Sequence, residues 1–219
     1  MKKIIAFSLW GDNPKYTIGA VKNANLTNII YPGWISRFYC GTSVPDDIIK
    51  ELKSVENTEI IIMNETGNWK GMFWRFYPAS EEDVDIMLSR DTDSRLNLRE
   101  KYAVDEWLKS DKDFHIMRDH PYHSTVILGG MWGVRNHLLK DMKNYINDYI
   151  KGNYWQIDQQ FLKNKIYPII RNNTFVHDEY FNYENWKKKF PVNRVGKEFV
   201  GEAFTFDDKP NMQHRNLIK

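Results

Sequence analysis

This sequence of 219 residues has little cysteine, little net charge and no long apolar run. Its single cysteine, Cys40, cannot form an internal disulfide, so a reducing compartment such as the cytoplasm fits best. No window approaches the roughly 18 consecutive apolar residues that span a bilayer. The apolar run within "MKKIIAFSLWGDNPKY" is too short for a signal peptide. We therefore expect a cytoplasmic protein whose membrane attachment, if any, is peripheral.

The charges nearly cancel, with 31 Lys and Arg against 29 Asp and Glu for a net charge of +2. This balance argues against nucleic acid or an anionic membrane as a partner, and any basic site must be local. Aromatic residues are abundant, with 8 Trp, 12 Tyr and 12 Phe. Such rings fill cores, but they also form platforms on which sugars and bases stack. The 42% hydrophobic content is enough for one compact domain.

The first part of the chain alternates β-rich apolar runs with amphipathic segments. This pattern is typical of a parallel sheet covered by helices. We expect strands at 3–11, 34–40 and 58–63, and helices at 16–30 and 44–55.

The alternation continues with less regular spacing. Pro78 and Pro168 each follow an apolar helical run and are expected to end it, and Asn97 with Glu100 forms a plausible capping box. The expected elements are a short helix at 72–80, a strand at 83–91, a helix at 97–109, strands at 114–119 and 125–134, helices at 137–150 and 155–168, and a short strand and loop at 174–181.

Two acids follow the central strand in "MLSRDTDSRL". Ligands of open parallel sheets bind beyond the carboxyl ends of the strands, so this position directs Asp91 and Asp93 toward that crevice. Two carboxylates suit Mg²⁺ or Mn²⁺ that arrives with a diphosphate, because substrate oxygens and water complete the shell. The alternative is an Asx-turn that caps the helix starting near Asn97. Both interpretations stay open at this point.

A second polar region leads from "MRDHPYH" to "ILGGMWG". Gly129 and Gly130 indicate either a close approach of the backbone to another group or a bulge. Trp132 could present a face to a sugar ring. Asp119 and His123, on the approach to this loop, are candidates for donor-sugar or acceptor contacts. Their spacing and the lack of cysteine do not fit a zinc site.

The segment from "FWRFYPASEEDVDIMLSRDTDSR" to "ILGGMWGVR" resembles GT-A-type glycosyltransferases of bacteria and large DNA viruses. The start, "IIAFSLWGDNPKYTIGAVKNA" with "YPGWISRFYCG", resembles the N-terminal glycosyltransferase domain of the multidomain enzymes that build chlorovirus capsid glycans. The resemblance covers most of residues 3–135 and weakens after about 180. It implies an α/β GT-A fold with a Rossmann-like, mixed but mainly parallel sheet.

The resemblance also implies a nucleotide-diphosphate sugar whose metal is held by the D-x-D. Asp93 would be the surer ligand, and Asp91 would bind the metal or the ribose hydroxyls. His177 in "TFVHDEYF" would complete the shell and favour Mn²⁺ over Mg²⁺. Asp158 in "WQIDQQFL" resembles the catalytic Asp of some retaining enzymes. The alternatives are a surface histidine and an acid at a helix N-terminus.

Further residues receive roles from the same resemblance. The end of the first strand would read the nucleotide base through its backbone, although Trp10 could instead belong to the core. Arg90 and Arg95 would add charge near the phosphates or pair with nearby acids such as Glu100. The donor-binding candidates are Ser8, Leu9, Trp10, Tyr16, Arg75, Arg90, Asp91 and Arg95. The sugar and acceptor candidates are Asp119, His123, Gly129, Gly130, Trp132 and Gln159.

We therefore expect one domain over 1–219, with a nucleotide-binding half at about 1–95 and an acceptor and catalytic half at about 96–219. The implied reaction is metal-dependent, retaining transfer of a glucose- or rhamnose-like sugar from a UDP-sugar to a glycan. The chain could belong to a larger multidomain protein, in the host cytoplasm if it is viral. The alternatives are a metal-dependent nucleotidyltransferase or phosphohydrolase, and a sugar-binding module without catalysis.

Overall fold

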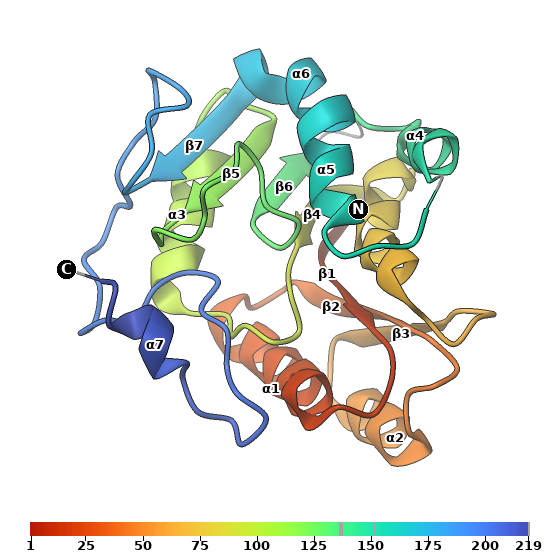
Figure 1. Cartoon of the computed structure of the whole chain (residues 1–219). Coiled ribbons are helices and arrows are strands. Elements are labelled where there is room, and N and C mark those ends of the chain that lie inside the picture. Colours follow the sequence, from red (N-terminus) through yellow and green to blue (C-terminus); the bar gives the residue numbers. More distant parts are fainter. Residues whose placement is uncertain (136–137, 151, 219) are drawn as a thin grey trace.

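A computed structural model of the chain describes residues 1–135, 138–150 and 152–218. Its strands form one twisted sheet in the order β3-β2-β1-β4-β6-β5-β7 (Figure 1). The strands are β1 (Lys2–Leu9), β2 (Ile35–Cys40), β3 (Thr58–Ile62), β4 (Val84–Ser89), β5 (Phe114–Arg118), β6 (Trp132–Arg135) and β7 (Thr174–Asp178).

The sheet is mainly parallel, as the sequence predicts. Strand β1 pairs in parallel with β2 and β4, and β5 pairs in parallel with β7. Strand β6 alone among these runs antiparallel, to both β4 and β5. The carboxyl ends of β1, β4, β5 and β7 therefore meet at one edge of the sheet, where ligands of such folds bind.

Helices cover both faces of the sheet (Figure 1). In β1, Ile5 and Phe7 pack toward one hydrophobic cluster and Ile4 and Ala6 toward the other, so this strand is buried on both sides. The first cluster includes side chains of α1, α2 and α3, and the second those of η1 and α4 to α6. The helices are α1 (Pro14–Ile30), α2 (Asp46–Ser54), η1 (Trp69–Ser80), α3 (Leu98–Leu108), α4 (Met142–Tyr149), α5 (Ile157–Phe161), the π-helix η2 (Leu162–Ile166), α6 (Tyr167–Ile170), η3 (Arg171–Asn173) and α7 (Met212–Arg215).

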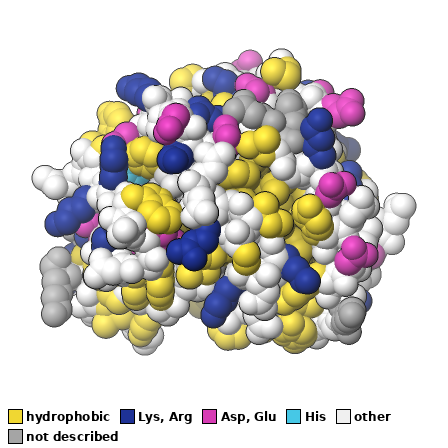
Figure 2. Space-filling model, turned by 90° about the horizontal axis from the view of Figure 1, so that it is seen from above, with side chains coloured by type: hydrophobic (Ala, Val, Ile, Leu, Met, Phe, Trp, Pro, Cys, Tyr) yellow, Lys and Arg dark blue, Asp and Glu magenta, His cyan; other side chains and the backbone are white. Residues whose placement is uncertain are grey.

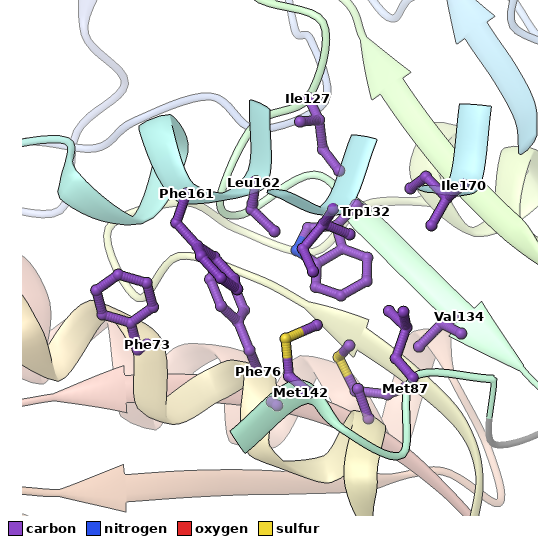
Figure 3. Close-up of a cluster of buried hydrophobic side chains, with 14 of the residues drawn as sticks. Phe73, Phe76, Met87, Ile127, Trp132, Val134, Met142, Phe161, Leu162 and Ile170 are labelled. Atoms are coloured by element: carbon purple, nitrogen blue, oxygen red, sulfur yellow. The ribbon is translucent and has the colours of Figure 1, made fainter. Parts of the chain in front are cut away.

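The second cluster is rich in large rings (Figure 3). Trp132 lies at its centre, with its ring 5.5 Å from that of Phe76, and Phe161 packs on the same phenylalanine. These residues come from β6, η1 and α5, so the cluster fixes three elements to one face of the sheet. Truncating such a ring to alanine typically costs about 3–5 kcal/mol of stability.

Three expected elements differ from the structure. The strand expected at 125–134 is reduced to β6, because the preceding residues form turns such as the bond from Met131 N–H to Leu128 O. The helix expected to end at Pro168 continues to Ile170. Pro168 is the second residue of α6, directly after η2, and a proline at a helix start lacks only an N–H that would be unpaired there. The expected helix 137–150 begins outside the described residues, and α4 starts at Met142.

The surface carries both signs of charge. On the face seen in Figure 2, Lys and Arg side chains alternate with Asp and Glu, and apolar side chains lie between them. This mixture agrees with the small net charge. Among the described residues, none of the helices has the length and apolar character needed to span a membrane.

Candidate functional site

Asp91 and Asp93 lie at the sheet edge that the sequence predicts. After β4, Arg90 N–H extends the ladder by donating to Ala6 O over 3.0 Å. The chain then turns, and the Ser94 hydroxyl donates to Asp91 O over 2.9 Å. Both carboxylates are partly exposed, with 39% of the Asp91 side chain accessible to solvent.

The aspartates do not cap helix α3. The N-cap is Asn97, whose Oδ1 accepts from Glu100 N–H over 2.8 Å. The predicted N-cap is confirmed, although the Glu100 carboxylate accepts from Arg90 and Tyr31. The capping alternative for the D-x-D is therefore wrong, and both acids keep their carboxylates for other partners.

Each aspartate is paired with one cation. Asp91 accepts from Arg75 Nη1, and Asp93 Oδ2 lies 2.7 Å from Lys15 Nζ. Arg75 comes from η1 and is almost fully buried, and its Nη2 also donates to Asp158 Oδ2 over 2.8 Å. Arg75 thus joins the end of β4 to the start of α5, and it brings two predicted site acids together.

Asp158 is a buried carboxylate with a free oxygen. Its side chain is inaccessible to solvent, and Oδ1 has no hydrogen-bond partner within the described part of the chain. Burial raises the pKa of Asp158, and Asp91 raises it further, while Arg75 acts in the opposite direction. Leaving a buried acceptor unpaired costs about 1–3 kcal/mol, so a ligand hydroxyl would be stabilised at this oxygen only if the residues that cover it moved aside.

Gly129 and Gly130 bring the loop before β6 against these acids. A Cβ on Gly129 would overlap Asp158 Oδ2 and Arg75 Nη2, and one on Gly130 would overlap the Asp91 carboxylate. The Ser89 hydroxyl donates to Gly129 O over 2.6 Å and fixes the loop at the end of β4. Only glycine allows this close approach at both positions.

The end of β1 forms the other wall of the site. Ser8 Oγ accepts from Arg75 N–H over 3.1 Å, and Leu9 is core. Trp10 packs edge-on against Trp74 at 6.1 Å, which supports the core alternative for its ring. Tyr16 remains exposed beside Lys15, whose ammonium lies 5.3 Å from the ring centre. Tyr16 is therefore the most exposed donor-binding candidate of this segment.

The structure corrects the roles predicted for two arginines. Arg90 is buried in the core, where Nε donates to Glu100 Oε1 over 2.7 Å. Arg95 donates to Asp208 Oδ1 over 2.7 Å and stacks on Phe204 at 4.6 Å. The alternative of pairing with acids therefore holds for both, and neither guanidinium is free to bind phosphate.

Three sugar or acceptor candidates are likewise part of the interior. Asp119 accepts from Arg99, Arg194 and the backbone N–H of Val200. His123 is buried and accepts from Asp119 N–H over 3.0 Å, and Trp132 is a core ring that offers no face to a ligand (Figure 3). Gln159 is half-buried on α5 next to Asp158 and keeps its predicted position near the site.

His177 does not join the D-x-D, which corrects its role as metal ligand. Its Nδ1 lies 2.8 Å from His115 Nε2 and its Nε2 lies 3.1 Å from Glu106 Oε2. Burial lowers the pKa of both histidines, so the neutral rings can pass hydrogen bonds from His115 through His177 to Glu106. With neighbouring strands about 4.8 Å apart, β7 lies about 14 Å from β4.

A divalent cation fits the two aspartates with an incomplete protein shell. The donor set is two carboxylates, which suits Mg²⁺ or Mn²⁺, and both side chains are partly exposed. The described residues contain no group of three or more potential metal-ligating side chains. The remaining ligands would therefore come from a diphosphate and from water.

Lys15 is the site residue that sequence reasoning missed. It is the second residue of α1, where Asn13 Oδ1 accepts from its N–H over 3.0 Å. Because α1 follows β1, its N-terminus lies at the same sheet edge as the residues after β4. The rule that located the D-x-D would also have located Lys15.

A separate cavity lies away from these acids. It has a volume of about 490 Å³ and includes Thr174, Phe175, Trp186 and Lys188 in its lining. Thr174 begins β7, and β7 runs parallel to β4, so this cavity opens at the sheet edge opposite to Asp91 and Asp93.

No protein-family model and no curated protein matches this sequence. Solved structures do match its fold. Glucosyl-3-phosphoglycerate synthase from Mycobacterium tuberculosis, in complex with uridine diphosphate, is 11% identical with a TM-score of 0.51, covering 89% of this chain and 73% of that one. S. aureus TarS is 12% identical with a TM-score of 0.51, covering 82% of this chain and 59% of that one.

A glycosyltransferase involved in glycosylation of the major capsid of PBCV-1 also matches. It is 20% identical with a TM-score of 0.48, covering 81% of this chain and 82% of that one. The chain has the GT-A fold, as the sequence predicts. Fold alone does not define activity, which must be argued from the site.

Proposed function

We propose that this chain is a metal-dependent glycosyltransferase that moves a glucose- or rhamnose-like sugar from a UDP-sugar to a glycan acceptor. One arrangement carries the proposal: Asp91 and Asp93 lie at the carboxyl edge of a GT-A sheet, and Arg75 joins Asp91 to the buried Asp158. The likeness to a synthase solved with uridine diphosphate supports a uridine nucleotide. The proposal assigns 1–95 to nucleotide binding and 96–219 to acceptor binding and catalysis.

In this reaction the bond between sugar C1 and the diphosphate oxygen breaks, and UDP leaves with the electron pair. An acceptor hydroxyl oxygen bonds to C1, and its proton passes to the departing diphosphate oxygen. A metal held by Asp91 and Asp93 would stabilise the charge on the leaving diphosphate. Asp158 would accept a hydrogen bond from a donor hydroxyl at Oδ1 and stabilise positive charge at C1. A carboxylate in that position supports transfer with retention.

The metal would be Mn²⁺ or Mg²⁺. The preference for Mn²⁺ rested on His177, whose ring nitrogens are engaged with His115 and Glu106. Two aspartates accept either ion because both are hard cations with oxygen ligands. The domain would take a glycan or glycoside as acceptor, alone or within a larger chain.

A panel of nucleotide sugars, incubated with the protein and Mn²⁺ or Mg²⁺, tests the reaction. Release of UDP supports transfer or slow donor hydrolysis. Release of a nucleoside monophosphate would favour pyrophosphate cleavage, and binding without turnover would favour a sugar-binding module. Product analysis of the anomeric centre would decide between retention and inversion.

The metal assignment has its own test. Asp93→Ala should abolish metal-dependent UDP binding in calorimetry while leaving the circular dichroism spectrum intact, because Asp93 is partly exposed and outside the core. Unchanged UDP affinity in this variant would refute the metal role of the D-x-D.

A further inference from the structure

Lys15 stands where the proposed metal and diphosphate would bind. Its ammonium lies 2.7 Å from Asp93 Oδ2, and its side chain is 32% exposed. Asn13 caps the start of α1 and fixes the lysine backbone on the rim of the site. A cation of the protein itself thus occupies one of the two carboxylates expected to hold the metal.

The two ion pairs at the D-x-D differ in how easily they can open. Arg75 is buried and also holds Asp158, so releasing Asp91 would require a buried guanidinium to move. Lys15 is partly exposed, and a lysine has a flexible stem with a compact charge. Lys15 is therefore the cation that can leave its aspartate at small cost.

The ammonium that leaves Asp93 has a second place to bind. The first turn of this 17-residue helix α1 contains no acidic residue, so no side chain of the turn itself offsets its positive N-terminal end. Helix N-termini and lysines both stabilise phosphate groups. A diphosphate next to Asp93 would lie within reach of Lys15 without movement of the backbone.

We propose that Lys15 is a diphosphate-binding residue that competes with the metal for Asp93 until the nucleotide arrives. Metal alone must displace Lys15 and leaves its charge unpaired, whereas metal with diphosphate gives the ammonium a new anion. Lys15 therefore makes metal binding depend on the diphosphate. This inference rests on the proposed function. It adds that tight metal binding requires the diphosphate to be present.

The test measures Mn²⁺ binding by electron paramagnetic resonance and calorimetry, without nucleotide and with UDP, UMP or uridine. In the wild type, UDP should raise Mn²⁺ affinity within the usual range of about 5- to 150-fold for coupled sites, and uridine should not. Lys15→Gln should bind Mn²⁺ alone at least about fivefold more tightly and should lose most of the enhancement by UDP.

Two variants serve as controls. Lys15→Arg keeps the charge and should keep the coupling between UDP and Mn²⁺. Lys22→Gln removes another lysine of α1, which pairs with Asp208 over 3.2 Å, and should behave as the wild type. Thermal unfolding of each variant verifies that it is folded.

The outcomes separate the two proposals. If the wild type binds Mn²⁺ and UDP together but Lys15→Gln shows the same coupling, the inference on Lys15 is wrong and the proposed function stands. If Lys15→Gln weakens Mn²⁺ binding without nucleotide, competition for Asp93 is also wrong. If the wild type binds no Mn²⁺ in the presence of UDP, both proposals fail.

Discussion

Arg75 Nη2 donates to Asp158 Oδ2 over 2.8 Å, and both side chains are almost fully buried. The same guanidinium holds Asp91 through Nη1. One buried cation therefore sets the relative positions of an acid after β4 and an acid at the start of α5. Gly129 approaches both partners so closely that a Cβ at this position would overlap them.

Removing Arg75 should destabilise the fold through Asp158. Arg75→Met leaves a buried carboxylate without its partner, and we expect a loss of about 3–5 kcal/mol in the free energy of unfolding. Urea denaturation measures this loss. Adding Asp158→Asn to Arg75→Met should recover part of it, because the unpaired charge is gone. If the stability loss of the double variant equals the sum of the losses of the two single variants, Arg75 and Asp158 are not coupled.

Gly130→Ala should impair ligand binding more than folding. The new Cβ would overlap the Asp91 carboxylate, so that side chain must turn away from its present position. We expect weaker Mn²⁺-dependent UDP binding in calorimetry. Gly152→Ala is the control, because its Cβ would meet only the ring of Tyr154, which is exposed and can move. If both substitutions change UDP binding equally, the close approach of Gly130 to Asp91 does not matter for ligand binding.

The position of the D-x-D could be predicted because it depends on short-range pattern and topology. Alternating β and α segments predict a parallel sheet, and the residues after a central strand then lie at the ligand-binding edge. Gly129 and Gly130 were singled out by another rule, that glycines within an expected strand indicate a close approach or a bulge, and the structure shows the close approach. These conclusions need only the order of elements along the chain.

Side-chain partners were harder to predict because they come from distant segments. Arg95 pairs with Asp208, 113 residues away, and Asp119 with Arg194, 75 residues away. Whether an arginine near a D-x-D meets a ligand or an acid depends on such contacts. His177 was misassigned for the same reason, since His115 and Glu106 come to it from β5 and α3.

Trp132 should contribute to the stability of the fold, because its ring lies in the hydrophobic core. Trp132→Ala should lower the free energy of unfolding by about 3–5 kcal/mol. Trp155, which is 66% exposed, offers the matched control. Trp155→Ala should change stability by no more than about 0.5 kcal/mol. Chemical denaturation of both variants measures the difference, and a small loss for Trp132→Ala would contradict its place in the core.

Mild acid should destabilise the protein through its buried histidines. Burial is the main cause that lowers the pKa of His123 to about 3, followed by the nearby His120. In the unfolded chain a histidine has a pKa of about 6.5, so below this pH the unfolded state takes up a proton that the folded state does not. The folded state is therefore favoured above about pH 6.5, and this contribution is lost as the pH falls toward the folded value.

Each such histidine lowers the free energy of unfolding by about 1.4 kcal/mol for each pH unit below about 6.5. His115 and His177, whose pKa values burial also lowers, add to it in the same direction. His123→Gln should make the fall in unfolding free energy between about pH 6.5 and 5 shallower by about that amount. Ordinary carboxylates stay ionised there, because their pKa values lie near about 4. Parallel stability curves for the variant and the wild type would show that His123 is protonated equally in both states.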